Sequence, residues 1–224
     1  MNKYKFTKKA DWWEIDHQLN FDFIKQYFMA IYIPFSESIP SNSCESSYRL
    51  SFLEIGVFEG RTSVWLLDNI LEIPNNGRSG ILHCIEPNLT KNGKFNLKQH
   101  MGNIILHEML SVKALISFIQ EDVFKFDFIY VDGDHNACGL LEDLVLSWKL
   151  LKVEGIMLID DYEMETTDPW HYKSHKEFNL HNPKLRFTHP RIAIDAFLGI
   201  YRGQFELIID NYQIGIKKII NLSQ

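Results

Sequence analysis

The chain of 224 residues has only three cysteines, Cys44, Cys84 and Cys138, and none stands at the short spacing of a metal-binding pair. An odd number without such spacing argues against a disulfide framework and a zinc site, so reduced thiols in the cytoplasm are expected. No apolar run approaches the roughly 20 residues that span a bilayer. The basic start, Met1 to Lys9, leads into Asp11 and Trp12 instead of the apolar core of a signal peptide. We therefore expect a cytoplasmic protein without a membrane segment.

The chain also lacks an excess of basic residues. It has 23 lysines and arginines against 29 aspartates and glutamates, a formal net charge of −6. Binding to nucleic acid depends on a basic stripe that neutralises phosphates, so a nucleic-acid partner is not expected. A small neutral or cationic ligand is compatible with this balance, and so is a homo-oligomer.

The first 48 residues differ in pattern from the rest. Within 19–34, apolar residues recur at helical spacing of three and four, namely Phe21, Ile24, Phe28 and Ile31. A serine-rich stretch at 36–47 indicates a linker. We expect residues 1–48 to be a helical segment and linker that precede a main domain at 49–224. Two interpretations of the helix stay open, namely packing on the domain edge and a lid over a pocket.

From residue 49 onward, short apolar runs alternate with helical patterns, which is typical of βαβ units. Strands are predicted near 50–56, 80–86, 103–107, 126–132 and 154–160, and helices near 60–72, 91–100, 111–120, 136–151 and 190–201. Two further β-like runs, 205–209 and 213–220, are joined by a turn short enough to predict an antiparallel hairpin. The expected fold is α/β, with five parallel strands, a terminal antiparallel hairpin and helices on both faces.

Acidic residues stand at the carboxyl ends of the predicted parallel strands. They are Glu54, Glu86, Asp132, Asp134, Asp160 and Asp161. In an open parallel sheet the ligand site lies beyond these ends, so the acids are expected to converge. Clustered carboxylates bind hydroxyl groups, a cation, or both.

Glycines mark the first junction between a strand and a helix. Gly56 permits a tight turn, and Gly60 permits close approach of an anionic group to the following helix. The third glycine of the dinucleotide fingerprint is missing, and Glu86 follows Gly56 by 30 positions instead of about 20. This spacing argues against a nicotinamide site. The alternative is that these glycines serve only the turn.

Three motifs together carry a resemblance to a known family. Glu54-Ile-Gly-Val-Phe-Glu-Gly-Arg-Thr62 precedes Asp132-Gly-Asp-His135 and Asp160-Asp-Tyr162. The chain resembles, over residues 50 to 220, the class I S-adenosylmethionine-dependent methyltransferases, and within them the small-molecule O-methyltransferase-like group. The resemblance implies a Rossmann-like sheet, S-adenosylmethionine as cofactor and methyl transfer as the reaction. The βαβ pattern breaks after Asp161 into a polar, histidine-rich stretch, and we expect a substrate-side insertion at 162–190.

The resemblance also implies roles for particular residues. Those placed at the cofactor are Glu54, Gly56, Phe58, Gly60 and Thr62 around the methionine part, Glu86 at the ribose hydroxyls, Ser111 on the adenine side, and Asp132. An ionised carboxylate such as that of Glu86 only accepts hydrogen bonds, which suits a diol.

A metal site and a base follow from the same resemblance. Asp132, Asp160 and Asp161 correspond to the three oxygen ligands of metal-dependent O-methyltransferases, and such ligands suit Mg²⁺ or a similar divalent cation. The alternative is that Asp160 and Asp161 cap a loop. His135 stands where relatives often carry a lysine as general base, and an imidazole with a pKa of about 6.5 can take a hydroxyl proton. It is also placed to cap the next helix. Asp134 is the second candidate base.

The function expected is methyl transfer from S-adenosylmethionine to an oxygen, in a sugar or a small natural product, with help from a divalent cation. The nearest alternative is a metal-free methyltransferase acting on nitrogen or a carboxylate. Further alternatives are a nicotinamide oxidoreductase and a binding module without catalysis. The sequence contains no recognisable code for the acceptor.

Overall fold

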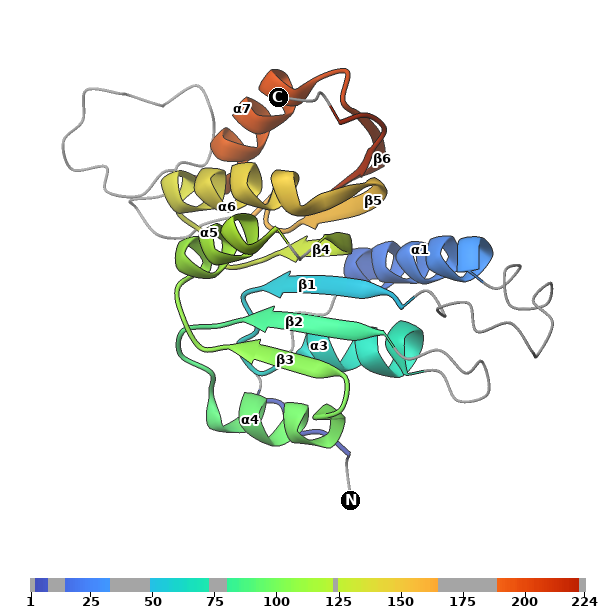
Figure 1. The fold of residues 1–224 in the computed structure, drawn as a ribbon, viewed down its shortest axis with the longest axis vertical. Coiled ribbons are helices and arrows are strands. Elements are labelled where there is room, and N and C mark those ends of the chain that lie inside the picture. Colours follow the sequence, from blue (N-terminus) through green and yellow to red (C-terminus); the bar gives the residue numbers. More distant parts are fainter. Residues whose placement is uncertain are drawn as a thin grey trace. The chain divides into compact units, whose positions relative to one another are not determined.

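A computed structural model describes residues 3–7, 15–32, 49–72, 80–122, 125–164 and 189–221 (Figure 1). The predicted linker at 36–47 and most of the predicted insertion at 162–190 lie outside these ranges. The chain divides into two compact units, residues 1–109 and 110–224, each of which is described by itself. Among the described residues, no helix combines the length and the apolar character needed to cross a membrane.

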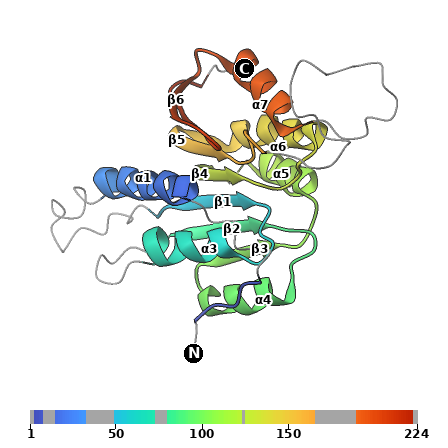
Figure 2. The same cartoon turned by 180° about the vertical axis from the view of Figure 1, so that it is seen from behind.

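The first unit contains a parallel sheet in the order β3-β2-β1. Its strands are β1 (Ser51–Ile55), β2 (Ile81–Ile85) and β3 (Ile104–His107). Parallel strands need crossover connections, and the helices supply them. These are α3 (Arg61–Leu66), continued by the π-helical turn η2 (Leu67–Leu71), and α4 (Lys91–Leu97), continued by the short η3 (Lys98–His100). Helix α3 lies on one face of these strands (Figure 2).

Apolar side chains from α1 and the sheet form the core of the first unit. Helix α1 (Ile15–Tyr32) buries Phe21, Ile24 and Phe28. The ring centroids of Phe28 and Phe52 of β1 are 4.9 Å apart. The apolar face predicted for this helix is therefore a packing surface, and the lid role stays a prediction.

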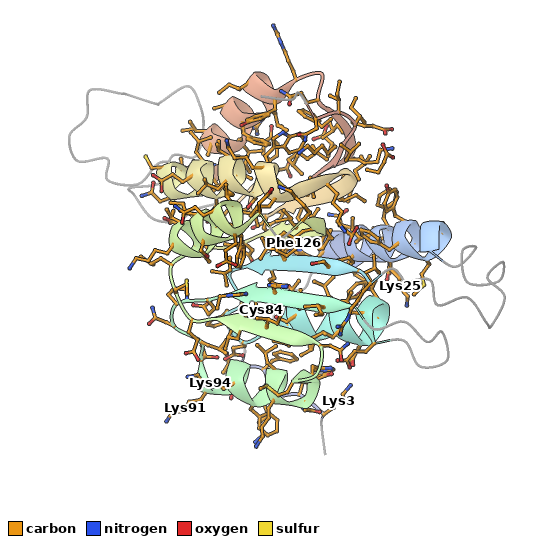
Figure 3. All side chains as sticks on the ribbon, viewed as in Figure 1. Lys3, Lys25, Cys84, Lys91, Lys94 and Phe126 are labelled. Atoms are coloured by element: carbon orange, nitrogen blue, oxygen red, sulfur yellow. The ribbon has the colours of Figure 1, made fainter. Side chains whose placement is uncertain are left out.

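Side chains of the first unit separate into buried and solvent-facing groups (Figure 3). Cys84 lies in β2 and is completely buried. Lys91 and Lys94 extend outward from α4. Burial, helped by the nearby Glu54 carboxylate, holds the pKa of the Cys84 thiol well above its usual range. Apolar runs around Cys84 and Cys138 predict that both are core residues; this is confirmed for Cys84 and wrong for Cys138, which is exposed.

The second unit contains the remaining four strands in the order β4-β5-β7-β6. Strands β4 (Phe126–Val131) and β5 (Leu151–Ile159) pair in parallel, β5 pairs antiparallel with β7 (Ile214–Lys218), and β7 pairs antiparallel with β6 (Phe205–Asp210). Its helices are α5 (Ser111–Glu121), α6 (Ala137–Leu150) and α7 (Pro190–Tyr201). The predicted strands are thus all present: β1 to β5 are the five predicted parallel strands, and β6 and β7 form the predicted terminal hairpin.

Strand β5 begins at Leu151, earlier than the predicted residue 154. Leu151 is buried and pairs with Phe126 of β4 before a shift of register. The Lys152 ammonium lies 3.0 Å from a carboxylate oxygen of Asp127. Pairing with β4 therefore extends the start of β5 back to the residue directly after α6. Helical periodicity, which depends on local sequence, did not predict this start.

A buried lysine joins the hairpin to the end of α6. The Lys218 ammonium donates to the carbonyl oxygens of Trp148 at 2.8 Å and Leu151 at 3.0 Å. The last carbonyls of a helix have no partner within the helix. Lys218 supplies one, although burial lowers the pKa of its ammonium to about 8.

Candidate functional site

The glycine loop that follows β1 has an uncommon backbone. Gly56 has φ 86°, Gly60 has φ 74°, and between them Phe58 has φ 50°. Glycine adopts this left-handed region without strain, whereas a bulky residue does so at a cost. The Phe58 side chain is also 42% exposed. A strained, exposed aromatic residue is a reason to suspect function at this loop.

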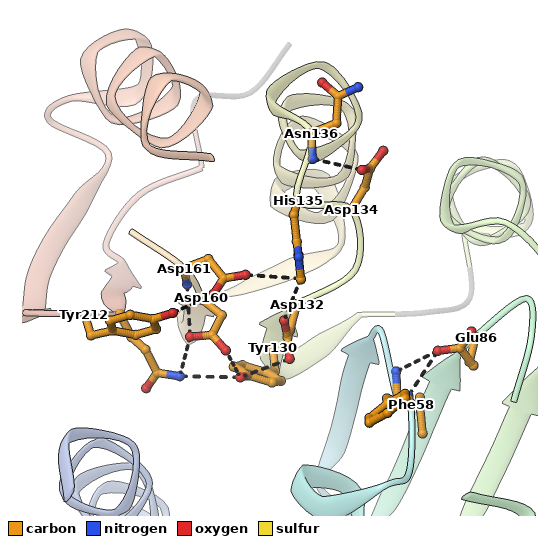
Figure 4. Close-up of polar contacts among 12 residues, drawn as sticks. Phe58, Glu86, Tyr130, Asp132, Asp134, His135, Asn136, Asp160, Asp161 and Tyr212 are labelled. Atoms are coloured by element: carbon orange, nitrogen blue, oxygen red, sulfur yellow. Dashed lines mark hydrogen bonds and ion pairs between the residues drawn. The ribbon is translucent and has the colours of Figure 1, made fainter. Parts of the chain in front are cut away.

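The Glu86 carboxylate holds the glycine loop (Figure 4). Its Oε2 accepts hydrogen bonds from the backbone N–H groups of Val57 and Phe58, both at 3.1 Å, and its Oε1 accepts from the N–H of Asn88 at 2.9 Å. A carboxylate has about four acceptor positions. These three bonds leave about one acceptor position open, so the predicted bonds from two ribose hydroxyls would require one of these amides to give way.

Glu54 lies beneath the same loop and is buried, with 1% of its surface exposed. The Ser63 hydroxyl donates to its Oε2 at 2.6 Å. Thr62, its neighbour in α3, is buried as well. The structure thus places Glu54 in the strand that enters the loop and Thr62 in the helix that follows it; their contact with a cofactor stays a prediction.

The second unit brings its acidic residues together at the ends of β4 and β5. Val131 pairs with Ile159 as the last residue of each strand. Asp132 follows the first and Asp160 and Asp161 follow the second, so the parallel register sets these acids side by side. The convergence predicted from the strand ends is found here for β4 and β5.

Three side chains converge at this edge, namely Asp132, His135 and Asp161 (Figure 4). The His135 Nε2 lies 3.6 Å from Asp132 Oδ1 and 3.1 Å from Asp161 Oδ2. One potential ligand atom from each residue lies within 4.8 Å of the others. This set differs from the predicted ligands by the exchange of Asp160 for His135.

The charges in this cluster depend on one another. Burial, reinforced by the Asp160 carboxylate, raises the pKa of Asp132 to about 8. The hydrogen bond with Asp132 raises the pKa of His135 to about 9, with Asp161 contributing. The neighbouring carboxylates thus move this pKa above the unperturbed imidazole value of about 6.5. Both raised pKa values reduce the negative charge of the cluster near neutral pH, because Asp132 holds a proton more readily than an exposed carboxyl does and His135 keeps its proton to a higher pH.

Asp160 has different surroundings. It is buried, its Oδ2 accepts from the Tyr130 hydroxyl at 2.6 Å, and its Oδ1 accepts from the Gln213 side-chain amide at 3.0 Å. Its Oδ1 also accepts from the backbone N–H of Asp161 at 3.0 Å. These bonds fix the turn after β5, as the loop-capping alternative proposed. A ligand role for Asp160 stays a prediction.

Asp161 has φ 65°, in the left-handed region. Asp and Asn tolerate this region better than most residues because their short side chains bond locally. The Tyr212 hydroxyl donates to Asp161 Oδ1 at 2.9 Å, which leaves Oδ2 toward His135. The backbone and Tyr212 together aim this carboxylate at the cluster.

His135 does not cap helix α6. The N-cap residue is Asn136, whose side-chain oxygen accepts from the backbone N–H of Cys138 at 3.2 Å. Asp134 Oδ1 accepts from the N–H of Asn136 at 2.9 Å, and Asp134 is exposed. His135 is thus left to the acid cluster, while Asp134 helps to form the turn.

The other predicted site residue of the second unit is Ser111, the first residue of α5. Sequence reasoning missed three polar residues near the acids, namely Tyr130, Tyr212 and Gln213. Tyr130 could have been identified from the sequence, because residues i and i+2 of a strand lie on the same face and Asp132 was already a candidate site residue. The other two come from the turn of the terminal hairpin, and no sequence pattern predicted that this hairpin pairs with β5.

Comparison with known proteins identifies the kind of domain. Residues 53–162 match the model of a family described as a methyltransferase domain. The chain carries a class I methyltransferase domain. The matched residues include the glycine loop, Glu86 and the acid cluster. The resemblance inferred from the three motifs is thereby confirmed.

One curated relative matches over part of its length. The chain is 31% identical over 119 residues to the uncharacterized protein R132 of Acanthamoeba polyphaga mimivirus. The match covers 51% of this chain and 52% of that protein. The chain thus spans about half the length of the relative that it matches.

Solved structures share the fold of the methyltransferase. A proposed caffeoyl-CoA O-methyltransferase from Staphylococcus aureus is 16% identical with a TM-score of 0.55, covering 89% of this chain and 83% of that one. A proposed rRNA methylase from Clostridium thermocellum is 11% identical with a TM-score of 0.58, covering 92% and 97%. The MycE methyltransferase of the mycinamycin pathway, in complex with Mg, S-adenosylhomocysteine and mycinamycin VI, is 12% identical with a TM-score of 0.51, covering 87% and 54%. At such low identity these likenesses establish the fold alone.

Proposed function

We propose that this methyltransferase transfers a methyl group from S-adenosylmethionine to a hydroxyl of a sugar or another small molecule, assisted by a divalent cation. The observation that carries the proposal is the convergence of Asp132, His135 and Asp161 at the ends of two parallel strands. Carboxylates at the carboxyl ends of such strands lie where α/β proteins bind ligands.

In this proposal the first unit binds the cofactor. The left-handed backbone at Gly56 and Gly60, without a Cβ atom at either position, permits close approach of the cofactor, and Glu86 offers the acceptor for a ribose hydroxyl. Phe58 is exposed beside these groups and is available for contact with an apolar part of the cofactor. In the second unit we assign Ser111 to the adenine side, as the family resemblance implies.

The donor set fits a divalent cation. Two carboxylates and one imidazole, each able to turn a ligand atom toward the others, are compatible with Mg²⁺ or Mn²⁺, and the imidazole favours the second. A bound cation would also take over the neutralising role of the His135 proton. It would act there as a Lewis acid that lowers the pKa of the acceptor hydroxyl.

The His135 Nε2 has two mutually exclusive roles. In the described geometry it faces Asp132 and Asp161, so a proton on this atom is shared with them. An Nε2 that holds the proton cannot bind a cation, and an Nε2 that binds the cation cannot accept the acceptor's proton. If His135 is a ligand, the exposed Asp134 is the remaining candidate base.

The test combines cation binding with turnover. Titration of the purified protein with Mn²⁺, followed by electron paramagnetic resonance, should show one bound ion that Asp161→Asn weakens. The matched control is Asp122→Asn, an exposed carboxylate at the end of α5. Turnover on a panel of hydroxyl acceptors should stop after chelation and return with Mg²⁺ or Mn²⁺.

A metal-free methyltransferase acting on nitrogen or a carboxylate is the second candidate. It is favoured by the ion pairs that His135 already makes with both carboxylates, since these need no cation to neutralise them. Full turnover after exhaustive chelation, with no Mn²⁺ signal, would reject the metal-dependent proposal and support this one.

A further inference from the structure

Residues 3–7, which we call the N-terminal strap, bind to the first unit through side chains far along the sequence. The backbone N–H of Lys5 donates to Asn96 Oδ1 at 2.7 Å, and Asn96 Nδ2 donates to the carbonyl of Lys5 at 2.9 Å. The side chain of Asn96 is completely buried. This paired contact aligns the strap along helix α4.

The strap ends on a residue of the glycine loop. The backbone N–H of Thr7 donates to Glu59 Oε2 at 2.7 Å, and the Thr7 hydroxyl donates to Glu59 Oε1 at 3.0 Å. Asn92 Nδ2 donates to the same Oε1 at 3.3 Å. Glu59 is buried, with 4% of its surface exposed. Three donors thus satisfy a carboxylate that would otherwise be expensive to bury.

Because Glu59 belongs to the glycine loop, its contacts with the strap also act on the loop. It stands between Phe58 and Gly60, both at positive φ, in the loop whose amides bind Glu86. The carbonyl of Glu59 accepts from Asn96 at 2.8 Å, so the strap and the loop share Asn96 as well. If the strap were released, the buried carboxylate would lose two of these donors and would gain by moving to water, which would move the loop.

We infer that Glu59 is a positioning residue through which the N-terminal strap holds the glycine loop in the conformation that binds the cofactor. The role in cofactor binding rests on the proposed function, whereas the effect on the loop does not. The strap therefore adds to the cofactor site a segment that lies outside the matched methyltransferase domain at 53–162.

The other end of the strap provides a control. The Tyr4 hydroxyl lies 2.7 Å from Asp68 Oδ2 and 2.7 Å from His100 Nε2. These partners belong to the ends of the helical segments that follow β1 and β2, and none is in the glycine loop. Tyr4→Phe removes these bonds while leaving the Thr7–Glu59 contact in place.

The experiment uses the full chain and compares Glu59→Gln, Thr7→Val and Tyr4→Phe with the wild type. In Glu59→Gln one acceptor becomes an NH₂ group that faces a donor, and in Thr7→Val only the hydroxyl is lost. Hydrogen exchange of the amides of Val57 and Phe58, measured without cofactor, reports the loop. Calorimetry with S-adenosylhomocysteine reports binding, and thermal unfolding reports stability.

We expect Glu59→Gln to speed exchange of both amides and to weaken S-adenosylhomocysteine binding about tenfold or more, the scale of one lost charge-assisted hydrogen bond. Thr7→Val should do the same to a smaller extent. Tyr4→Phe should change the unfolding temperature but neither loop readout.

The two possible failures are distinguishable. Unchanged exchange in Glu59→Gln would overturn the role of the strap, whatever the affinity. A wild-type protein that binds no S-adenosylhomocysteine would overturn the proposed function, and with it the role of the strap in cofactor binding. Equal effects of Tyr4→Phe and Glu59→Gln on the loop would mean that the strap acts through general stability, and would also overturn the assignment of Glu59.

Discussion

Replacing Glu86 by alanine should weaken cofactor binding by an amount that the structure bounds. The carboxylate already accepts three backbone N–H groups, so about one acceptor position is open to a ribose hydroxyl. A second hydroxyl would displace an amide, and its gain would be offset by that loss. The net contribution is therefore one charge-assisted hydrogen bond, about 1.5–3 kcal/mol, which corresponds to roughly a 10- to 150-fold loss of affinity.

Calorimetric titration with S-adenosylhomocysteine measures this loss directly. The matched control is Glu108→Ala, an exposed glutamate of the same unit whose carboxylate lies 3.4 Å from the Lys94 ammonium. Surface pairs of this kind contribute little, so the control should bind as the wild type does. Thermal unfolding of both variants should remain cooperative, because Glu86 bonds a loop and is not part of the core.

Two results would refute this reasoning. Unchanged affinity in Glu86→Ala would remove Glu86 from the cofactor site and leave it a loop-holding residue only. A loss well above about 1,000-fold, more than 4 kcal/mol, would mean that both hydroxyls bind without displacing an amide. The count of acceptor positions would then be wrong.

Further predictions concern the loop, the sheet and the hairpin. Gly56→Val should abolish S-adenosylhomocysteine binding in calorimetry, because φ 86° is strained for a β-branched residue; normal binding would place the cofactor elsewhere. Burial, with His107 nearby, lowers the pKa of His83 to about 4. The contribution of neutral His83 to the free energy of unfolding is therefore intact above pH 6.5 and is lost as the pH falls toward 4. Urea unfolding should show this loss as up to about 3 kcal/mol. His83→Phe should flatten that part of the pH profile, and an unchanged slope would contradict the assignment. Lys218→Met should lower the unfolding temperature by removing the donor to two carbonyls. The loss should be larger near pH 10 than at pH 7, because a pKa lowered to about 8 makes the wild type gain stability as the pH rises above 8, and the Met variant lacks this gain; equal losses at both pH values would contradict the lowered pKa.

Local patterns in the sequence were enough for much of the fold. Alternation of apolar runs and helical periodicity depends on residues within a few positions of one another, and it predicted all five parallel strands and the terminal hairpin. The turn glycines, Gly56 and Gly60, were likewise identifiable, because few other residues adopt positive φ without strain. The boundary between α6 and β5 was misplaced, because it depends on pairing with Phe126, which lies in another strand.

The positions of the acids were determined by the sequence, but their roles were decided by tertiary contacts. Asp132, Asp160 and Asp161 follow strands whose ends the pattern of apolar residues predicts. That Asp160 bonds Tyr130 and Gln213 while His135 joins the other two depends on the hairpin and on the turn before α6. The pKa of about 9 at His135 also depends on tertiary structure, since it comes from the hydrogen bond with Asp132 and the nearby Asp161 carboxylate, although the imidazole itself is 54% exposed. Sequence spacing determines which groups lie at an edge of the sheet. Hydrogen bonding and desolvation by segments distant in sequence determine which of these groups are available for binding or catalysis.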